Sequence, residues 1–262
     1  MAFTGNKFEF RALGGPQSVA TINIAINATV AKTLGDISDA IEAAAKKGGK
    51  TGAEAARELL PKFFREHRVA VFNGDNYSAE WVEEAAQRGL PNLRDSVMAL
   101  ELYDTPEVIS VFEGQNVLSR PEVLARQHIL LEDYTGRLLI EADLTLSIGR
   151  TIIKPTAIKW LERLAGVARS SLELLGDNQA EVAAYRDIRD LTTGLTQALR
   201  ELDDAIATVN SCSCEPKGKA ASARDNLLPA MAAVRSKADQ LEKMVDAGLW
   251  PMPTYSDLFW SI

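Results

Sequence analysis

The sequence predicts a mainly α-helical protein: a bundle of long helices with an antiparallel coiled-coil hairpin, and one or two strands at the N-terminus. Apolar residues recur every three or four positions over long stretches, as they do along one face of an α-helix. Aromatic residues make up only 6% of the 262 residues, while alanine is abundant. This composition is typical of helices that pack closely through small side chains. The two-residue alternation of a strand occurs near the start of the chain.

In that first segment Lys7, Glu9 and Arg11 would project from one face of a strand, and Phe8 and Phe10 from the other. Three charged groups on one face need partners such as a metal ion, a phosphate or a carboxylate. The alternation by itself slightly favours an exposed edge strand that carries a solvated ladder of ions. The residues that follow shift the balance towards a functional strand.

A turn rich in glycine and proline, residues 12–18, separates this strand from a long apolar helix. Ser18 is a plausible cap for that helix. Apolar residues then follow at spacings of three and four, at Val19, Ile22, Ile26, Val30, Leu34, Ile37 and Ile41. Residues 46–52 contain three glycines and predict a turn or a boundary.

Beyond this boundary the chain is expected to continue as helices with short interruptions. Pro61 is expected to kink the first of them. Ser78 can cap a helix that ends at Gly89. Residues 119–122 have the sequence of a capping box and open the longest helical stretch, which is expected to bend at Pro155.

The last two helices show the clearest periodicity. Their heptad seams consist of Ile188, Leu191, Leu195, Ala198, Leu202, Ala205 and Val209, and of Leu227, Met231, Val234, Ala238, Leu241 and Val245. A polar loop, residues 211–221, joins the seams and predicts an antiparallel hairpin. An intramolecular core is favoured over an interface with another chain.

Cys212 and Cys214 are the only cysteines, and both fall in this loop. A disulfide across so short a loop would be strained, and a zinc site needs four ligands. We therefore expect two exposed thiols, with a metal or redox role as the distant second reading. His67 and His128 are isolated in the sequence, and we expect both to serve in packing or on a helix surface.

The chain carries a net charge of −7, which argues against nucleic acid or an anionic membrane as a partner. No signal peptide is visible, and no apolar run is long enough to span a bilayer. A cytoplasmic, soluble protein is expected. Trp250, Tyr255, Phe259 and Trp260 predict an apolar tail that docks on its own subunit.

Three separated segments resemble motifs of type III glutamine synthetases. Residues 3–11 resemble the basic-x-Glu-x-Arg strand that leads through a turn into a core helix of the catalytic domain. Residues 72–78, followed by Trp81 and by residues 88–93, are similar to a second motif. Residues 249–255 are similar to a third. The resemblance runs along the whole chain, and chance does not readily place three motifs in this order.

The resemblance implies two regions. Residues 1–50 would be the end of the α+β catalytic barrel, with a strand, a turn and a core helix. Residues 51–262 would be the helical C-terminal extension of the type III family. The family also forms homo-oligomers of stacked rings, in which neighbouring subunits share active sites.

The resemblance further implies ATP-dependent ligation of ammonia to glutamate through γ-glutamyl phosphate. The carboxylate at the position of Glu9 ligates a divalent ion, Mg²⁺ or Mn²⁺, which prefers oxygen ligands. The residue matching Arg11 contacts the glutamate substrate and the transferred phosphoryl group, and is the catalytic residue expected here. Lys7 lies where many relatives place an arginine that contacts the nucleotide phosphates.

A full family member carries most of its catalytic barrel before this segment, including the other metal-binding carboxylates. One glutamate does not hold two or three cations, so we expect the isolated chain to have no ligase activity. The competing function is a free-standing helical module for assembly or regulation. In that case the charged strand would be an inherited remnant.

Overall fold

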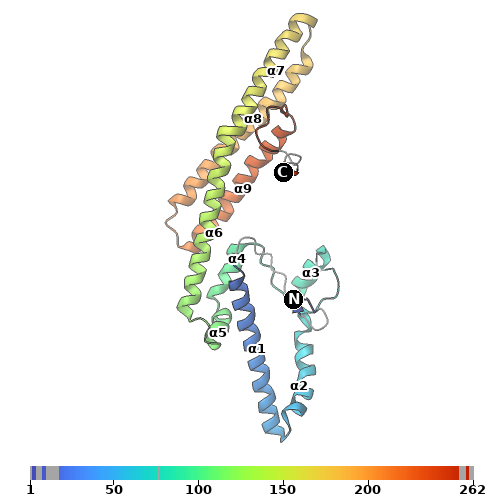
Figure 1. The fold of residues 1–262 in the computed structure, drawn as a ribbon, viewed down its shortest axis with the longest axis vertical. Coiled ribbons are helices and arrows are strands. Elements are labelled where there is room, and N and C mark those ends of the chain that lie inside the picture. The colour runs from blue at the N-terminus through green and yellow to red at the C-terminus, as the bar shows by residue number, and fades with distance from the viewer. Residues whose placement is uncertain (1, 4–7, 10–17, 76, 254–257, 260–262) are drawn as a thin grey trace. The chain divides into compact units, whose positions relative to one another are not determined.

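The computed structural model describes residues 2–3, 8–9, 18–75, 77–253 and 258–259, and these are mainly helical (Figure 1). The predicted fold class is confirmed at this level. The chain divides into two compact units, Met1–Gln127 and His128–Ile262. The boundary predicted at residue 50 separates the end of a catalytic domain from its helical extension. It stays a prediction.

The first unit opens with two very short strands, β1 (Ala2–Phe3) and β2 (Phe8–Glu9). They pair antiparallel, with Ala2 opposite Glu9 and Phe3 opposite Phe8. Phe8 and Glu9 are therefore extended and have strand partners within the same chain.

The helix α1 (Val19–Gly48) begins at the predicted cap, where the Ser18 hydroxyl accepts a hydrogen bond from the Ala20 amide at 3.2 Å. It ends at Gly49, whose φ of +59° lies in the left-handed region that glycine adopts without strain. The helix α2 (Gly52–Glu66) follows at once, and Figure 1 shows the two helices meeting at this turn. A capping box between Thr51 and Glu54 starts α2. The helix continues through Pro61.

Short helices complete the first unit: η1 (His67–Ala70), α3 (Ala79–Gln87), α4 (Ser96–Glu101), η2 (Leu102–Asp104) and α5 (Pro106–Gly114). Ser78 caps α3, and Gly89 follows its end with φ +72°, as the sequence predicts. The core of this unit is small and apolar, and its buried residues are Ala28, Ile109, Phe112 and Val123.

The helix α6 (Arg120–Ile148) starts in the first unit and continues into the second. Its predicted capping box is present, because the Ser119 amide and hydroxyl both donate to the Glu122 carboxylate, at 2.8 and 2.7 Å. A π-helical turn, η3 (Gly149–Ile153), connects α6 to α7 (Lys154–Leu175). The bend at Pro155 stays a prediction, and the π-helical turn lies just before this proline. The wider turn gives room to a residue that has no amide hydrogen and a bulky ring.

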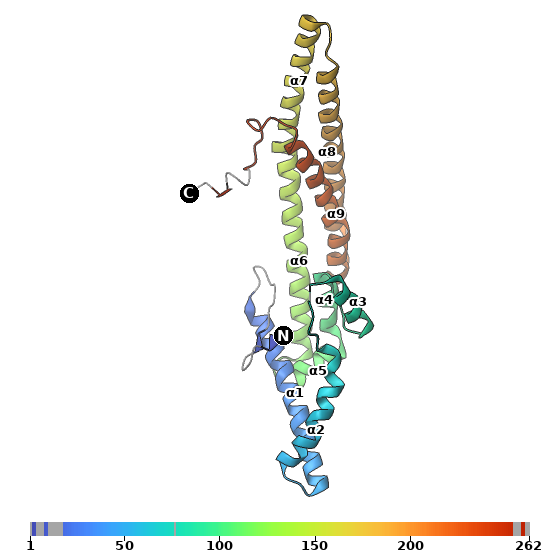
Figure 2. The same cartoon turned by 90° about the vertical axis from the view of Figure 1, so that its right-hand side faces the viewer.

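The second unit is completed by α8 (Gln179–Ser211) and α9 (Pro216–Glu242), which lie side by side (Figures 1 and 2). Most residues of the two predicted seams are buried in one core that α6 and α7 share: Ile188, Leu195, Ala198, Leu202 and Val209, and Leu227, Val234, Ala238, Leu241 and Val245. This burial agrees with an intramolecular core. The coiled-coil character of the pair stays a prediction.

The expectation of two free thiols is wrong in this structure. Cys212 and Cys214 form a disulfide, and no free cysteine remains. The chain leaves α8 in an extended conformation at Cys212 (φ −66°, ψ 116°) and turns into α9 shortly afterwards. This path sets the two Cα atoms 5.3 Å apart, within the usual range for disulfides.

The C-terminal tail is only partly packed. Leu249 and Trp250 are half-buried against the core of the second unit, whereas Phe259 is 76% exposed. Tyr255 and Trp260 lie outside the described residues. Among the helices that the structure describes, none combines the length and the apolarity needed to cross a bilayer.

Candidate functional site

The sequence places the candidate site at the N-terminus, at Lys7, Glu9 and Arg11. The structure describes Glu9, the last residue of β2, and sets its backbone opposite Ala2. Lys7 and Arg11 lie outside the described residues. That these three side chains project from one face of the strand therefore stays a prediction.

A divalent ion would need more oxygen ligands than Glu9 offers, since Mg²⁺ and Mn²⁺ favour about six. Within the described part of the chain, no group of three His, Cys, Asp or Glu side chains could hold a metal ion. A metal bound through Glu9 would have to take its remaining ligands from elsewhere.

Described residues of the second sequence motif make several contacts with Arg88, and we call this set of contacts the Arg88 brace. The rings of Phe72 and Trp81 stack with their centroids 4.0 Å apart and their planes 25° apart. The Arg88 guanidinium lies over both rings, 5.9 Å from the Phe72 centroid and 5.4 Å from the Trp81 centroid. These distances are within the range of cation–π attraction.

The same guanidinium also ties the backbone before the loop to α3. Arg88 Nη1 donates to the carbonyl oxygens of Val69 and Val71, at 3.1 and 2.9 Å. Its Nη2 forms an ion pair with Glu84, one helical turn earlier. Only an arginine offers a fork of donors that can satisfy two carbonyls and a carboxylate at once.

Short-range hydrogen bonds shape the loop between Phe72 and α3. The Asp75 carboxylate accepts from the Tyr77 amide at 2.9 Å, and the Ser78 hydroxyl accepts from the Trp81 amide at 3.2 Å. Gly74 lies beneath the Phe72 ring, since a Cβ atom added there would be 2.5 Å from Cζ of that ring. Tyr77 is left 91% exposed at the turn. These contacts hold the described backbone of the loop.

The second motif was recognised in the sequence, but no role was predicted for Arg88. The position of Arg88 in the sequence does not reveal a stack, because the contact depends on how the loop folds back on α3. The nearby aromatic pair, Phe72 and Trp81, was the signal that could have suggested a cation–π partner.

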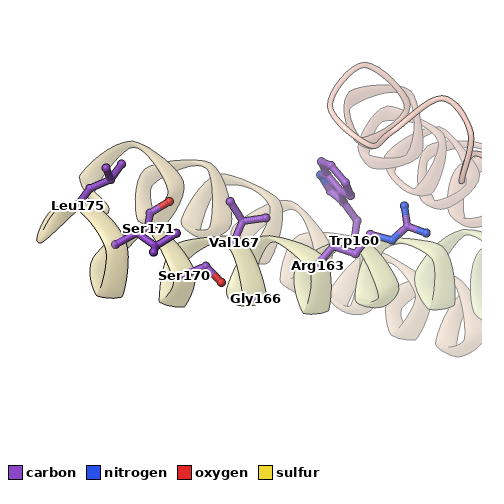
Figure 3. Close-up of a pocket in the computed structure, with 8 residues that line it drawn as sticks. Trp160, Arg163, Gly166, Val167, Ser170, Ser171 and Leu175 are labelled. Carbon is purple, nitrogen blue, oxygen red and sulfur yellow. The ribbon is translucent and has the colours of Figure 1, made fainter.

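A shallow groove of about 620 Å³ runs along α7 in the second unit (Figure 3). It is lined by Trp160, Arg163, Gly166, Val167, Ser170, Ser171, Leu174 and Leu175. Arg163 forms an ion pair with Asp246 at 3.4 Å. The lining of the groove includes no carboxylate, histidine or cysteine. The groove is therefore better suited to an apolar contact than to catalysis.

Comparison with known proteins identifies relatives along the entire chain. Residues 55–171 match the model of the glutamine synthetase C-terminal domain. This match includes the brace around Arg88 and excludes Lys7, Glu9 and Arg11.

Three curated relatives align with almost the full chain. A glutamine synthetase of Bacteroides fragilis is 29% identical over 99% of this chain and 36% of its own length. A type-3 glutamine synthetase of Dictyostelium discoideum is 30% identical over 98% of this chain and 35% of its own length. A glutamine synthetase of Butyrivibrio fibrisolvens is 27% identical over 100% of this chain and 37% of its own length. The chain thus spans about a third of the length of these relatives.

Proposed function

We propose that this chain, which belongs to the glutamine synthetase family as a C-terminal portion of a type III enzyme, contributes to an ATP-dependent glutamate–ammonia ligase. In the proposed reaction, ATP phosphorylates the side-chain carboxylate of glutamate, and ammonia then displaces phosphate. The observation that carries this proposal is the alignment of 98–100% of the chain with glutamine synthetases.

The residues at the N-terminus would supply part of the electrostatics of phosphoryl transfer. Negative charge spreads over the transferred group, and fixed cations lower the barrier by neutralising it. Arg11 suits this task because its guanidinium can hold phosphoryl and carboxylate oxygens with two hydrogen bonds. Lys7 would offer a single positive charge to the nucleotide phosphates.

Glu9 would be a metal ligand in the complete enzyme. A carboxylate on a strand is a hard, well-positioned oxygen donor for Mg²⁺ or Mn²⁺. The bound ion would offset charge on the phosphates. In this proposal the β1–β2 ribbon and α1 are the end of the catalytic barrel, and the remaining metal ligands come from parts of the enzyme outside this chain.

The helices from α2 onwards would then form the extension typical of the type III family. Within it, α8 and α9 would be an antiparallel coiled-coil hairpin, and the Arg88 brace would hold one loop rigid. Assembly into stacked rings of identical subunits belongs to the same proposal.

A segment exchange tests the proposed function. The part of the Bacteroides fragilis glutamine synthetase that aligns with this chain would be replaced by the chain, and glutamine formation measured. We expect activity from the chimera and none above background from the isolated chain. An active isolated chain, or a folded chimera without activity, would contradict the proposal.

Substitutions in the chimera then assign the residues. Glu9→Ala and Arg11→Ala should each lower kcat by about 10²-fold or more, since each removes a charge that acts in the transition state. Lys7→Arg should keep most of the activity. The exposed Glu83 offers a matched carboxylate control, and Glu83→Ala should leave kcat unchanged.

The second candidate function is a helical module for assembly or regulation. The groove along α7 favours it, because its lining is largely apolar. An inactive chimera that still assembles through this segment would support the module.

A further inference from the structure

We propose that Cys212 and Cys214 form a reversible dithiol–disulfide couple that exchanges with small thiols of the glutathione class, with Cys214 carrying the charge in the reduced state. This modification site lies between α8 and α9 and does not depend on the ligase function.

The disulfide closes a very small loop, with one serine between its two cysteines. In the chain-entropy model, a cross-link over so few residues restricts the unfolded chain much less than one over a long loop. Stabilisation of the fold is therefore a weak reason for this bond. A bond that adds little stability is suited to be made and broken.

Cys214 lies against the first turn of α9. A Cβ atom added at Gly218 would be 3.1 Å from Cys214 Cβ and 3.9 Å from its Sγ. The helix has 27 residues, and no side chain caps its N-terminus. A thiolate at this position would be stabilised by the positive end of the helix dipole, as in reactive cysteines at helix N-termini.

Stabilisation of one thiolate favours the reduced form and makes the disulfide easier to reduce. Cys212 lacks this advantage, because it follows the C-terminal end of α8, where the dipole is negative. The two sulfurs are therefore unequal. Cys214 is the better leaving group, and Cys212 is the sulfur that an incoming thiolate should attack.

A pocket of about 430 Å³ is lined by both cysteines and by residues of α6. This volume is within the range of small-molecule sites. Glu132 and Lys219 line it and place one charge of each sign beside the disulfide. Glutathione carries carboxylates as well as an ammonium group, so these charges are complementary to it.

The exchange is balanced in two steps. A glutathione thiolate attacks Cys212 Sγ, a mixed disulfide forms, and the Cys212–Cys214 bond breaks with Cys214 leaving as the thiolate. A second glutathione thiolate attacks the glutathione sulfur of the mixed disulfide, and Cys212 is released as a thiolate that takes up a proton. Two glutathione molecules are oxidised to one disulfide, and the protein disulfide gains two electrons.

Equilibration in glutathione buffers tests the couple. The 262-residue chain would be incubated at a series of ratios of reduced to oxidised glutathione and quenched with acid. Free thiols would then be alkylated, and the oxidised fraction would be measured by mass spectrometry. We expect the oxidised fraction to pass through one half within the series. A pair that stays oxidised in a hundredfold excess of reduced glutathione, or never oxidises in oxidised glutathione alone, would overturn the proposal.

Alkylation rates test the assignment of the charge. In Cys212→Ser, the remaining Cys214 should react with iodoacetamide with a pH midpoint about one unit below that of Cys212 in Cys214→Ser. Gly218→Ala should raise the Cys214 midpoint, because the added methyl group crowds Cys214 Cβ at 3.1 Å and displaces this residue from the helix. Ser213→Ala keeps both cysteines and should match the unaltered chain in the glutathione series. Equal midpoints for the two cysteines would overturn the role of Cys214.

Discussion

The Arg88 side chain connects several segments of the first unit. It contacts two aromatic rings, two backbone carbonyls and a carboxylate, which belong to the loop, the preceding segment and α3. Its side chain is only 26% exposed, so these contacts are partly shielded from water. We attribute this set of contacts to the planar guanidinium rather than to charge alone.

Replacement of Arg88 by lysine should therefore be costly although the charge is kept. We expect Arg88→Lys to lower the free energy of unfolding by about 1–2 kcal/mol, since it removes hydrogen bonds to Val69 and Val71 and the stacked geometry. Urea unfolding of the chain measures this change. The exposed Arg94 is the matched control, and a loss from Arg94→Lys as large as that from Arg88→Lys would contradict the account.

The glycines of the helical stretch through α6, η3 and α7 differ in the space available around their Cα atoms. Gly149, in the π-helical turn, is buried, and a Cβ atom added there would be 2.5 Å from Cδ2 of Leu199. Leu199 is itself 2% exposed and has little room to move. Gly136, in α6, has no atom within 4 Å of such a Cβ. The first glycine is required by packing, and the second is not.

These two positions form a matched pair of substitutions. Gly149→Ala should lower the free energy of unfolding by about 1–3 kcal/mol, because the methyl group overfills the core against Leu199. Gly136→Ala should raise it by about 0.5–1 kcal/mol, because alanine loses less entropy in a helix. Thermal or urea unfolding measures both. A stabilising Gly149→Ala would show that the turn relaxes freely.

The sequence predicted the helices more completely than the sites, for physical reasons. Seam residues such as Leu195 and Leu227 are buried because a period near 3.5 residues sets one face of a helix against its neighbour. Caps at Ser18 and Ser78 follow from local hydrogen bonds. The cysteine pair was misjudged, since its geometry depends on the backbone path between α8 and α9. The π-helical turn was likewise not predicted, although Pro155 is a local signal for an irregular helix.

At the scale of the whole molecule, the chain is two compact helical units, with its predicted charged strand in the first. Lys7 and Arg11 could be proposed for a role only through the resemblance to a family, because alternation alone slightly favours a solvated edge strand. Glu9 has a role implied by the family resemblance, and the structure also describes its position in β2. We propose that its carboxylate binds a divalent cation in a complete ligase.

Mn²⁺ binding to the segment-exchange chimera tests this claim most directly. Glu9→Gln keeps the size of the side chain and removes its charge, so one class of bound Mn²⁺ should lose affinity by about tenfold or more. Electron paramagnetic resonance of free Mn²⁺ in a titration measures the number of sites and their affinities. We predict that the substitution weakens one class of sites and that Glu83→Gln changes none. Unchanged Mn²⁺ binding in Glu9→Gln would contradict the account.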